Sequence, residues 1–369
     1  MERILFVCRS LKESSNLGYW FKILDHFAKR GYDVHLCAQE IKERLRPKNI
    51  RTISIPRHFK NFLLNEILIP FQTLKRIKRE KYDLIYSHSS RYILADIMGV
   101  HFLFSHESGR GVFPFFLKPI ERFSFFPSSK KILTVSNFMK NLLVRGYGIR
   151  PSRIGVIHYG VDTTRFNFNL RKGKAARDLR KRLSENSENL ILYVGGRPFR
   201  KGLAYLIEAM KYVADSRLVI SGVKGDEKKH FENLCSKFDL RNRVVFTGFL
   251  EHEKLRYYYA ASDVFVLPSL FDPFGLVVLE AMASGSVPVI SRYTGASELI
   301  EPLKNGLIIN DPRNPKEIAS RIKTVLEDKP LRKRMQRNAV RTAARMDWKR
   351  VAEKWEEFFR EVYEAKSLP

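Results

Sequence analysis

The sequence contains few cysteines and no long apolar run. Cys8, Cys37 and Cys235 are the only cysteines in 369 residues, and none forms a C-x-x-C pair. This excludes a small disulfide-stapled scaffold and predicts buried, reduced thiols, as in a cytosolic protein. No stretch approaches the roughly 18 consecutive apolar residues of a membrane-spanning helix, so none is expected. The N-terminal MERILFVCR is too short for a signal peptide and is better explained as a first strand.

Acidic residues are also scarce. There are 39 Asp and Glu against 67 Lys and Arg, which gives a net charge of +28. Such an excess favours an anionic partner, which could be a nucleic acid, an anionic lipid or a phosphorylated substrate. The 44% hydrophobic and 29% charged content excludes a disordered chain and a coiled coil. The length predicts two or three domains at roughly 150 residues each.

Short apolar runs alternate with amphipathic helical segments along the chain. Such runs predict buried parallel strands covered by helices on both faces. One series comprises residues 4–8, 33–38, 84–88, 101–105, 131–136 and 154–158, and a second comprises 190–195, 217–222, 243–248, 263–268 and 287–291.

The pattern lapses near residues 160–170, so we expect two doubly wound α/β domains, 1–165 and 166–347. A long helical stretch is predicted over 315–366. Ligands of doubly wound sheets bind at the carboxyl ends of strands, and we expect the site in the cleft between the domains.

A first candidate site is SLFDPFGLVVLEAMASGSVPVI, residues 269–290. A predicted strand ends at Pro268 and a helix begins near Gly275, so the first helical amides, including those of Leu276 and Val277, favour a phosphate. The carboxylates of Asp272 and Glu280 could accept hydrogen bonds from sugar hydroxyls. The alternative is that Asp272 caps the helix and Glu280 is solvated.

A second candidate site is LYVGGRPFRKGLAYLIEAM, residues 192–210. Arg197 and Lys201 follow a predicted strand and precede a helix, an arrangement that suits a diphosphate. The alternative is that both are solvated charges of a very basic protein.

Together these segments resemble glycosyltransferase family 4, retaining enzymes of the GT-B fold. DPFGLVVLEAMASGSVPV (272–289) is similar to the family pattern E-x-F-G-L-x-x-L-E-A-M-A-x-G-x-P-V, and Asp272 stands where Glu is usual. VGGRPFRKG resembles the donor-phosphate loop, and HYGVD (158–162) the interdomain linker. The resemblance implies that the helix at about 348–369 crosses back to the first domain.

The resemblance also assigns roles to individual residues. Donor contacts are implied for Gly18, Arg197, Lys201, Gly248, Phe249, Leu250, Asp272, Phe274, Gly275, Leu276, Val277 and Glu280. Catalytic roles are implied for His106, Asp272, Arg197 and Lys201. Positions on the acceptor side are implied for His88, His106 and Glu107. The alternative for each histidine is a structural role.

Two basic, aromatic stretches, 57–81 and 101–131, suit an interfacial membrane contact. The alternative is that their phenylalanines pack inside the first domain. We found no nucleic-acid recognition motif and expect no nucleic-acid partner.

Together with the family resemblance, these observations imply a cytoplasmic transferase, peripheral on the inner face of the membrane. The expected donor is a nucleotide-diphosphate sugar, with a UDP-sugar favoured, and no metal is required. The Phe-rich, basic first domain resembles family members that build the lipopolysaccharide core, which implies a lipid-linked glycan or a lipopolysaccharide core as acceptor. The expected state is a monomer. The alternatives are a GT-B nucleotide-sugar epimerase and a nucleic-acid-binding protein that exploits the +28 charge.

Overall fold

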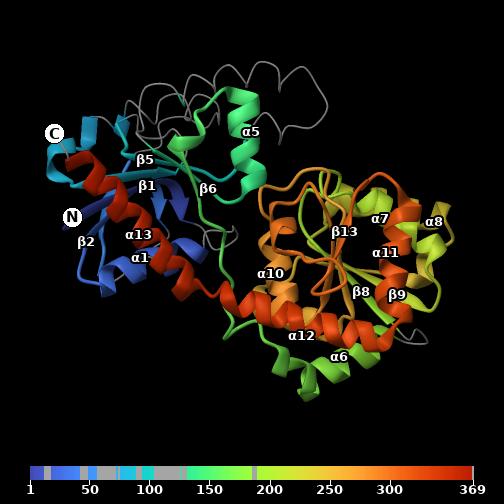
Figure 1. Cartoon of the computed structure of the whole chain (residues 1–369). Coiled ribbons are helices and arrows are strands. Elements are labelled where there is room, and N and C mark those ends of the chain that lie inside the picture. Colours follow the sequence, from blue (N-terminus) through green and yellow to red (C-terminus); the bar gives the residue numbers. More distant parts are fainter. Residues whose placement is uncertain are drawn as a thin grey trace. The chain divides into compact units, whose positions relative to one another are not determined.

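The computed structural model divides the chain into two compact units. Unit 1 comprises Met1–His158 and Trp348–Pro369, and unit 2 comprises Tyr159–Asp347. The residues that the structure describes are 1–11, 18–41, 49–55, 72–73, 75–88, 94–103, 125, 131–184 and 189–367. Each unit is built around its own parallel sheet (Figure 1). The prediction of two domains, each built on a parallel sheet, is confirmed.

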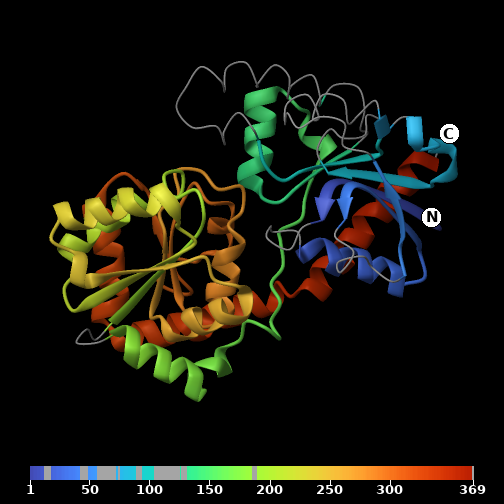
Figure 2. The ribbon, with the colours of Figure 1, turned by 180° about the vertical axis from the view of Figure 1, so that it is seen from behind.

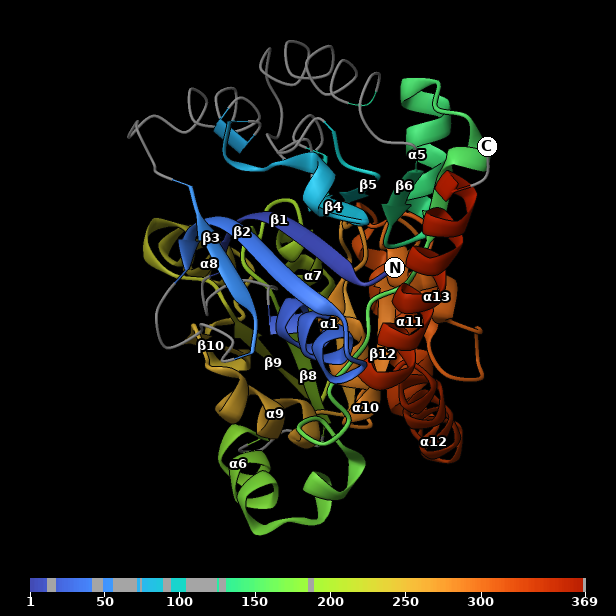
Figure 3. The ribbon, with the colours of Figure 1, turned by 90° about the vertical axis from the view of Figure 1, so that its left-hand side faces the viewer.

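Unit 1 holds a seven-stranded sheet in the order β3-β2-β1-β4-β5-β6-β7. All of its neighbouring strands pair in parallel. Figure 3 shows β3, β2 and β1 side by side. The strands are β1 (Arg3–Leu11), β2 (Asp33–Ile41), β3 (Arg51–Ser54), β4 (Leu84–His88), β5 (Ile97–Val100), β6 (Lys131–Thr134) and β7 (Ile154–Val156).

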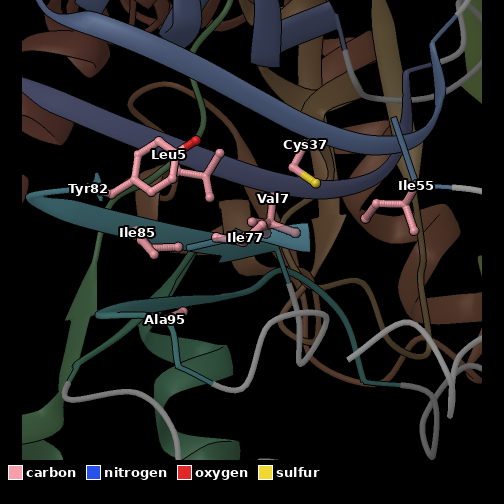
Figure 4. Packing of buried hydrophobic residues seen from close by; sticks show 8 residues of the cluster. All are labelled: Leu5, Val7, Cys37, Ile55, Ile77, Tyr82, Ile85 and Ala95. Carbon is pink, nitrogen blue, oxygen red and sulfur yellow. The ribbon is translucent and has the colours of Figure 1, made fainter. Parts of the chain in front are cut away.

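Alternate residues of β1 serve two different cores, because side chains along a strand point to opposite faces. Leu5 and Val7 belong to an aliphatic cluster with Cys37 and Ile85 (Figure 4). Phe6 points the other way, and its ring lies 5.6 Å from that of Phe359. A strand buried on both faces therefore needs an unbroken apolar run, as the N-terminal sequence has.

The aromatic core of unit 1 is covered by α1 (Gly18–Lys29) and α13 (Trp348–Ser367). Figure 1 shows the red α13 beside the blue α1. α5 (Asn137–Tyr147) follows β6 and is capped by Ser136, whose hydroxyl accepts a hydrogen bond from the Met139 amide. The last helix of the chain therefore completes the first unit.

A buried carboxylate ties α13 to α1. Glu356 is 5% exposed, and its oxygens lie 2.8 Å from His26 Nε2 and 3.0 Å from the Tyr32 hydroxyl. Burial opposes ionisation of Glu356, but the hydrogen bonds from His26 and Tyr32 outweigh it and hold its pKa below the usual value. This network fixes the returning helix by polar as well as aromatic contacts.

Unit 2 holds a six-stranded parallel sheet in the order β10-β9-β8-β11-β12-β13. The strands are β8 (Asn189–Val194), β9 (Ser216–Ser221), β10 (Val244–Gly248), β11 (Val264–Leu267), β12 (Val287–Ser291) and β13 (Leu307–Ile309).

Two layers of helices cover the sheet of unit 2, as Figure 2 shows from behind. One layer comprises α7 (Leu203–Ala209), α8 (Gly225–Lys237) and α11 (Pro315–Glu327). The other comprises α6 (Lys174–Ser184), α9 (His252–Ala261), α10 (Leu276–Ala283) and α12 (Lys329–Arg345). The predicted helical stretch 315–366 consists of three separate helices, α11, α12 and α13.

Two details of the strand prediction for unit 1 were wrong. The predicted strand over 101–105 is displaced, because β5 occupies Ile97–Val100 and residues 101–103 lie outside any strand. The edge strand β3 was missed, because RTIS has polar residues at its ends and only partly buried ones between. Edge strands bury less apolar surface and so give a weaker signal.

Candidate functional site

The strand order of unit 2 reverses direction at β8. The chain goes from β8 outward to β9 and β10, and then returns to the other side of β8 with β11. Crevices outside the carboxyl ends of such strands are where doubly wound sheets bind ligands. The loops that leave β8 and β11 are the two segments that the sequence singled out.

These two loops lie against each other. The backbone at Gly202 has φ +70°, and a Cβ placed there would come within 2.0 Å of the Pro268 carbonyl oxygen. The Leu270 amide donates to the Arg200 carbonyl at 2.9 Å, and the Arg200 guanidinium donates to the Phe271 carbonyl at 2.5 Å. Glycine at 202 is therefore required for the close approach of the two loops.

Lys201 crosses from the first loop to the second. Its ammonium nitrogen lies 3.5 Å from Asp272 Oδ2, and the two side chains are only 12% and 9% exposed. The aliphatic part of Lys201 lies over Gly195, where a Cβ would meet Lys201 Cδ at 2.5 Å. The sequence had placed these two groups in one site, and the structure brings them together.

Backbone hydrogen bonds join the Asp272 loop to the loop after β12. The Asp272 amide donates to the Tyr293 carbonyl at 2.9 Å, and the Gly295 amide donates to the Asp272 carbonyl at 3.0 Å. The Asp272 carboxylate also accepts from the Phe274 amide at 3.3 Å, which is a contact within the loop before α10 and not the helix cap that the alternative described. Only one of its oxygens is used in this way.

α10 begins at this edge of the sheet. Its N-cap is Gly275 with φ +83°, and a Cβ at that position would lie 2.9 Å from Thr294 Cγ2. In the part of the chain that the structure describes, no side chain caps this helix. Its first amides, including those of Leu276 and Val277, therefore present positive potential beside Lys201. Phe274 is buried, and its ring meets that of Tyr159 at 5.4 Å.

Glu280 lies one turn inside α10 and is held from α9. The Tyr259 hydroxyl donates to Glu280 Oε2 at 2.8 Å, and His252 Nε2 lies 3.8 Å from Oε1. Burial raises the pKa of Glu280, although His252, Tyr259 and Lys201 all favour its ionised form. The carboxylate is 14% exposed, so it is not the solvated group that the alternative described.

Arg197 and the loop after β10 lie on the exposed part of this region. Arg197 has a positive φ of 56°, and its carbonyl accepts from the Lys201 amide at 3.1 Å. Gly248 also has a positive φ, of 70°, and its carbonyl accepts from the Gly222 amide at 2.8 Å. Phe249 is 65% exposed. Leu250, which follows it, is partly buried.

Only some of the candidate residues of the first unit lie in the part of the chain that the structure describes. α1 begins at Gly18. His88 ends β4 and is 9% exposed, with its ring 4.6 Å from that of His101 and 5.3 Å from that of Trp20. His106 and Glu107 lie outside the described residues.

Sequence reasoning missed the partners of Glu280. Tyr259 and His252 lie on α9, 21 and 28 residues before Glu280 in the chain (280 − 259 and 280 − 252). A tyrosine in the apolar stripe of a helix has the pattern of a core residue, so no local signal predicts that its hydroxyl meets a carboxylate.

Among the described residues, no group of three or more His, Cys, Asp or Glu could hold a metal ion. In the same part of the chain, no helix has the length and apolar character needed to cross a membrane.

Two protein families match this chain. The family described as Glycosyltransferase Family 4 matches residues 19–165, and the one described as Glycosyl transferases group 1 matches residues 175–342. An uncharacterized glycosyltransferase of Methanocaldococcus jannaschii is 31% identical over 289 residues, which cover 74% of each chain. An Escherichia coli enzyme named UDP-Gal:alpha-D-GlcNAc-diphosphoundecaprenol alpha-1,3-galactosyltransferase is 26% identical over 282 residues, 71% of each chain.

Solved structures share the fold. WaaG, a glycosyltransferase involved in lipopolysaccharide biosynthesis, aligns with a TM-score of 0.78 at 18% identity, over 96% of this chain and 99% of its own. Anabaena HepE, solved in complex with UDP and glucose, aligns with a TM-score of 0.79 at 20% identity, over 98% of this chain and 100% of its own. With the fold and both family matches in agreement, the chain belongs to glycosyltransferase family 4 and is a glycosyltransferase of the GT-B fold.

Proposed function

We propose that this glycosyltransferase takes a sugar from a nucleotide-diphosphate sugar, with a UDP-sugar favoured, and transfers it with retained configuration to a lipid-linked glycan or lipopolysaccharide-core acceptor. The observation that carries the donor assignment is the juxtaposition of Lys201, Asp272 and the uncapped start of α10. An ammonium group, a carboxylate and a helix N-terminus therefore lie together in unit 2, at the point where the strand order reverses direction.

The relatives support the donor and the acceptor class. HepE was solved with UDP-glucose, and the E. coli relative is named for a UDP-sugar donor and a lipid-linked acceptor. WaaG is described as acting in lipopolysaccharide biosynthesis. We further propose that the enzyme works in the cytoplasm as a monomer, peripheral on the inner membrane face where such an acceptor would lie.

Each group of residues in the proposed site binds a different part of the donor. Arg197, Lys201 and the first amides of α10 bind the diphosphate and stabilise the charge that grows on it as the glycosidic bond breaks. Glu280 accepts hydrogen bonds from ribose hydroxyls, and Asp272 from the hydroxyls of the sugar. The loop Gly248–Leu250 covers the base. Tyr259 donates to Oε2 of Glu280, and Oε1, which lies 3.8 Å from His252 Nε2, accepts the hydrogen bond from the ligand.

The remaining proposed residues act near the acceptor. Gly18, the first residue of α1, approaches the donor, and His106, Glu107 and His88 stand on the acceptor side. The acceptor hydroxyl attacks from the face that the diphosphate leaves, and the leaving phosphate takes its proton. No side chain is assigned as a general base.

Replacing both Arg197 and Lys201 with Ala should lower turnover far more than it weakens binding of the free nucleoside. Both cations face the diphosphate, whose charge is greatest in the transition state. Two charged contacts at about 1.5–3 kcal/mol each correspond to a loss of at least a hundredfold in kcat/KM. Steady-state kinetics and nucleoside calorimetry measure the two effects. Equal losses for nucleoside and nucleoside diphosphate would contradict the assignment.

Activity should survive EDTA with less than a twofold loss. Lys201 and the amides of α10 supply positive charge where other transferases use a divalent cation, so chelation removes nothing that the reaction needs. The measurement is the initial rate before and after chelation. Loss of activity that a divalent metal restores would refute this proposal.

Incubation with a panel of nucleotide sugars tests the function itself. We expect slow hydrolysis of one donor, with the released sugar in the configuration that it had in the donor. Interconversion of donors without hydrolysis would favour an epimerase, and tight RNA binding without donor binding would favour a nucleic-acid-binding protein.

A further inference from the structure

α12 (Lys329–Arg345) has an unusual distribution of charge. Its 17 residues read KPLRKRMQRNAVRTAAR and include no acidic residue. The nearest carboxylate along the chain, Asp328, caps the helix by accepting from the Leu331 amide at 2.8 Å. The basic residues of the helix are Lys329, Arg332, Lys333, Arg334, Arg337, Arg341 and Arg345.

The two sides of α12 differ sharply. Met335, Ala339 and Ala343 are fully buried, and the helix packs against α10 and α11. Figure 1 shows α12 along one margin of unit 2. The opposite side is exposed to solvent, and we call it the basic face of α12. It comprises Lys333, Arg334, Arg337, Arg341 and Arg345.

The spacing on this face produces a nearly continuous row. Lys333, Arg337, Arg341 and Arg345 are each four residues apart, so consecutive charges lie about one helical turn, or roughly 6 Å, from one another. The row extends over about 18 Å, as three such intervals require. Like charges at this spacing destabilise a helix, so packing against α10 and α11 must hold it together.

Among the residues that the structure describes, no carboxylate pairs with the basic face. Within the described part of the chain, none of its residues forms an ion pair, and Arg341 makes a weak contact of 3.4 Å with the neutral Asn338. Other helices of unit 2 differ, because Lys228 lies 3.2 Å from Glu232 on α8 and Arg321 lies 3.5 Å from Glu317 on α11. The basic face is thus a surface of positive charge alone, whereas α8 and α11 present positive and negative side chains together.

We propose that the basic face of α12 binds the anionic headgroups of a lipid surface. A row of exposed cations on a straight helix can contact a flat negative surface along its whole length. The face has no aromatic side chain on which a base could stack, so single-stranded nucleic acid is less well matched. The inference rests on the proposed function, because a lipid-linked acceptor requires the enzyme to work at such a surface.

Replacing Lys333, Arg334, Arg337 and Arg341 with Ser in the full-length chain tests the proposal. Each cation near an anionic surface contributes about fivefold to binding, so the variant should bind phosphatidylglycerol vesicles at least a hundredfold more weakly. The matched control replaces Lys224, Lys228, Lys229 and Lys237 with Ser on and beside α8, an equal loss of charge from a mixed surface. Vesicle co-sedimentation at low salt should find the control variant close to the wild type, and neutral phosphatidylcholine vesicles should bind none of the three proteins.

Two outcomes would overturn the proposal. Equal loss in both variants would mean that net charge alone drives binding, and no loss in either would place the contact elsewhere. If the α12 variant instead loses binding to RNA, while no form of the protein binds vesicles, the face serves a nucleic acid. Thermal unfolding of each variant checks that unit 2 is intact.

Donor hydrolysis, measured in solution without lipid, distinguishes a failure of this proposal from a failure of the proposed function. We expect the α12 variant to hydrolyse a soluble nucleotide sugar at the wild-type rate, because the basic face includes none of the donor-site residues. If the wild type hydrolyses no donor, the proposed function fails, whereas the vesicle comparison still decides whether the basic face binds lipid.

Discussion

Replacing Glu280 with Gln is expected to weaken binding of the nucleotide-diphosphate sugar by roughly ten- to a hundredfold, because a charged hydrogen bond is worth about 1.5–3 kcal/mol. Gln keeps an acceptor for the Tyr259 hydroxyl, which lies 2.8 Å from the carboxylate, so the fold of unit 2 should persist. Isothermal titration calorimetry with the donor and with free nucleotide measures the loss.

The same site predicts a pH dependence. Burial raises the pKa of Glu280, so its carboxylate is protonated at a higher pH than an exposed one. In the proposed site the ribose hydroxyls would donate to the ionised form, and donor affinity should therefore fall as the pH drops through this raised pKa. Glu280→Gln should remove that dependence.

Glu253 offers the matched control, because it is an exposed carboxylate on the same helix as Tyr259. Its side chain is 57% exposed and pairs with Arg165 at 3.2 Å. Glu253→Gln should leave donor affinity within about twofold of the wild type, as expected for a surface ion pair. If Glu280→Gln binds the donor as tightly as Glu253→Gln does, Glu280 is not a donor ligand.

Replacing Asp263 with Asn should cost unit 2 about 3 kcal/mol of stability, at the lower end of the range for breaking a buried ion pair. Asp263 is 5% exposed and precedes β11. Its carboxylate lies 2.8 Å from Arg180 and 4.0 Å from both Arg171 and Arg332, and burial lowers the pKa of Arg171 to about 10. Without the carboxylate, three guanidinium groups would stand together uncompensated.

Differential scanning calorimetry measures this effect. A loss of about 3 kcal/mol corresponds to a fall of roughly 6–12 °C in the Tm of a domain of this size. Asp226→Asn on α8 is the control, because Asp226 is fully exposed and its pair with Lys229 spans 3.8 Å. Equal Tm values for the two variants would show that Asp263 does not hold the arginines in place.

The parallel sheets could be predicted because their strands are buried on both faces and are therefore continuously apolar. This continuous apolar pattern is clear in the runs ILFVC (4–8) and LILYVG (190–195), where the structure has β1 and β8. The edge strand β3 carries little of it, because Arg51 and Ser54 are exposed. The strand predicted at 101–105 was misplaced because the apolar character of Ile97–Val100 continues into Phe102 and Leu103, which lie beyond the end of the strand.

The proximity of the two candidate loops could be predicted because helix starts and strand ends leave local signals. Gly195 and Gly196 at a strand end indicated the first loop, and a strand end at Pro268 before the helix start at Gly275 indicated the second. The structure brings Lys201 within 3.5 Å of Asp272. The partners of Glu280 and Asp263 could not be predicted in this way. Tyr259 reaches Glu280 and Arg180 reaches Asp263 only after α9 and α6 pack on the sheet, and no spacing along the chain encodes those contacts.

The position of a bound nucleotide diphosphate tests the central claim most directly. A crystal structure of the full-length chain with UDP, or with the donor identified by the panel, would locate it. We predict the diphosphate at the carboxyl ends of β8 and β11, against Lys201 and the first amides of α10, with the ribose at Glu280. A nucleotide bound elsewhere on unit 2, with Lys201 still paired to Asp272 and no ligand at Glu280, would contradict the account.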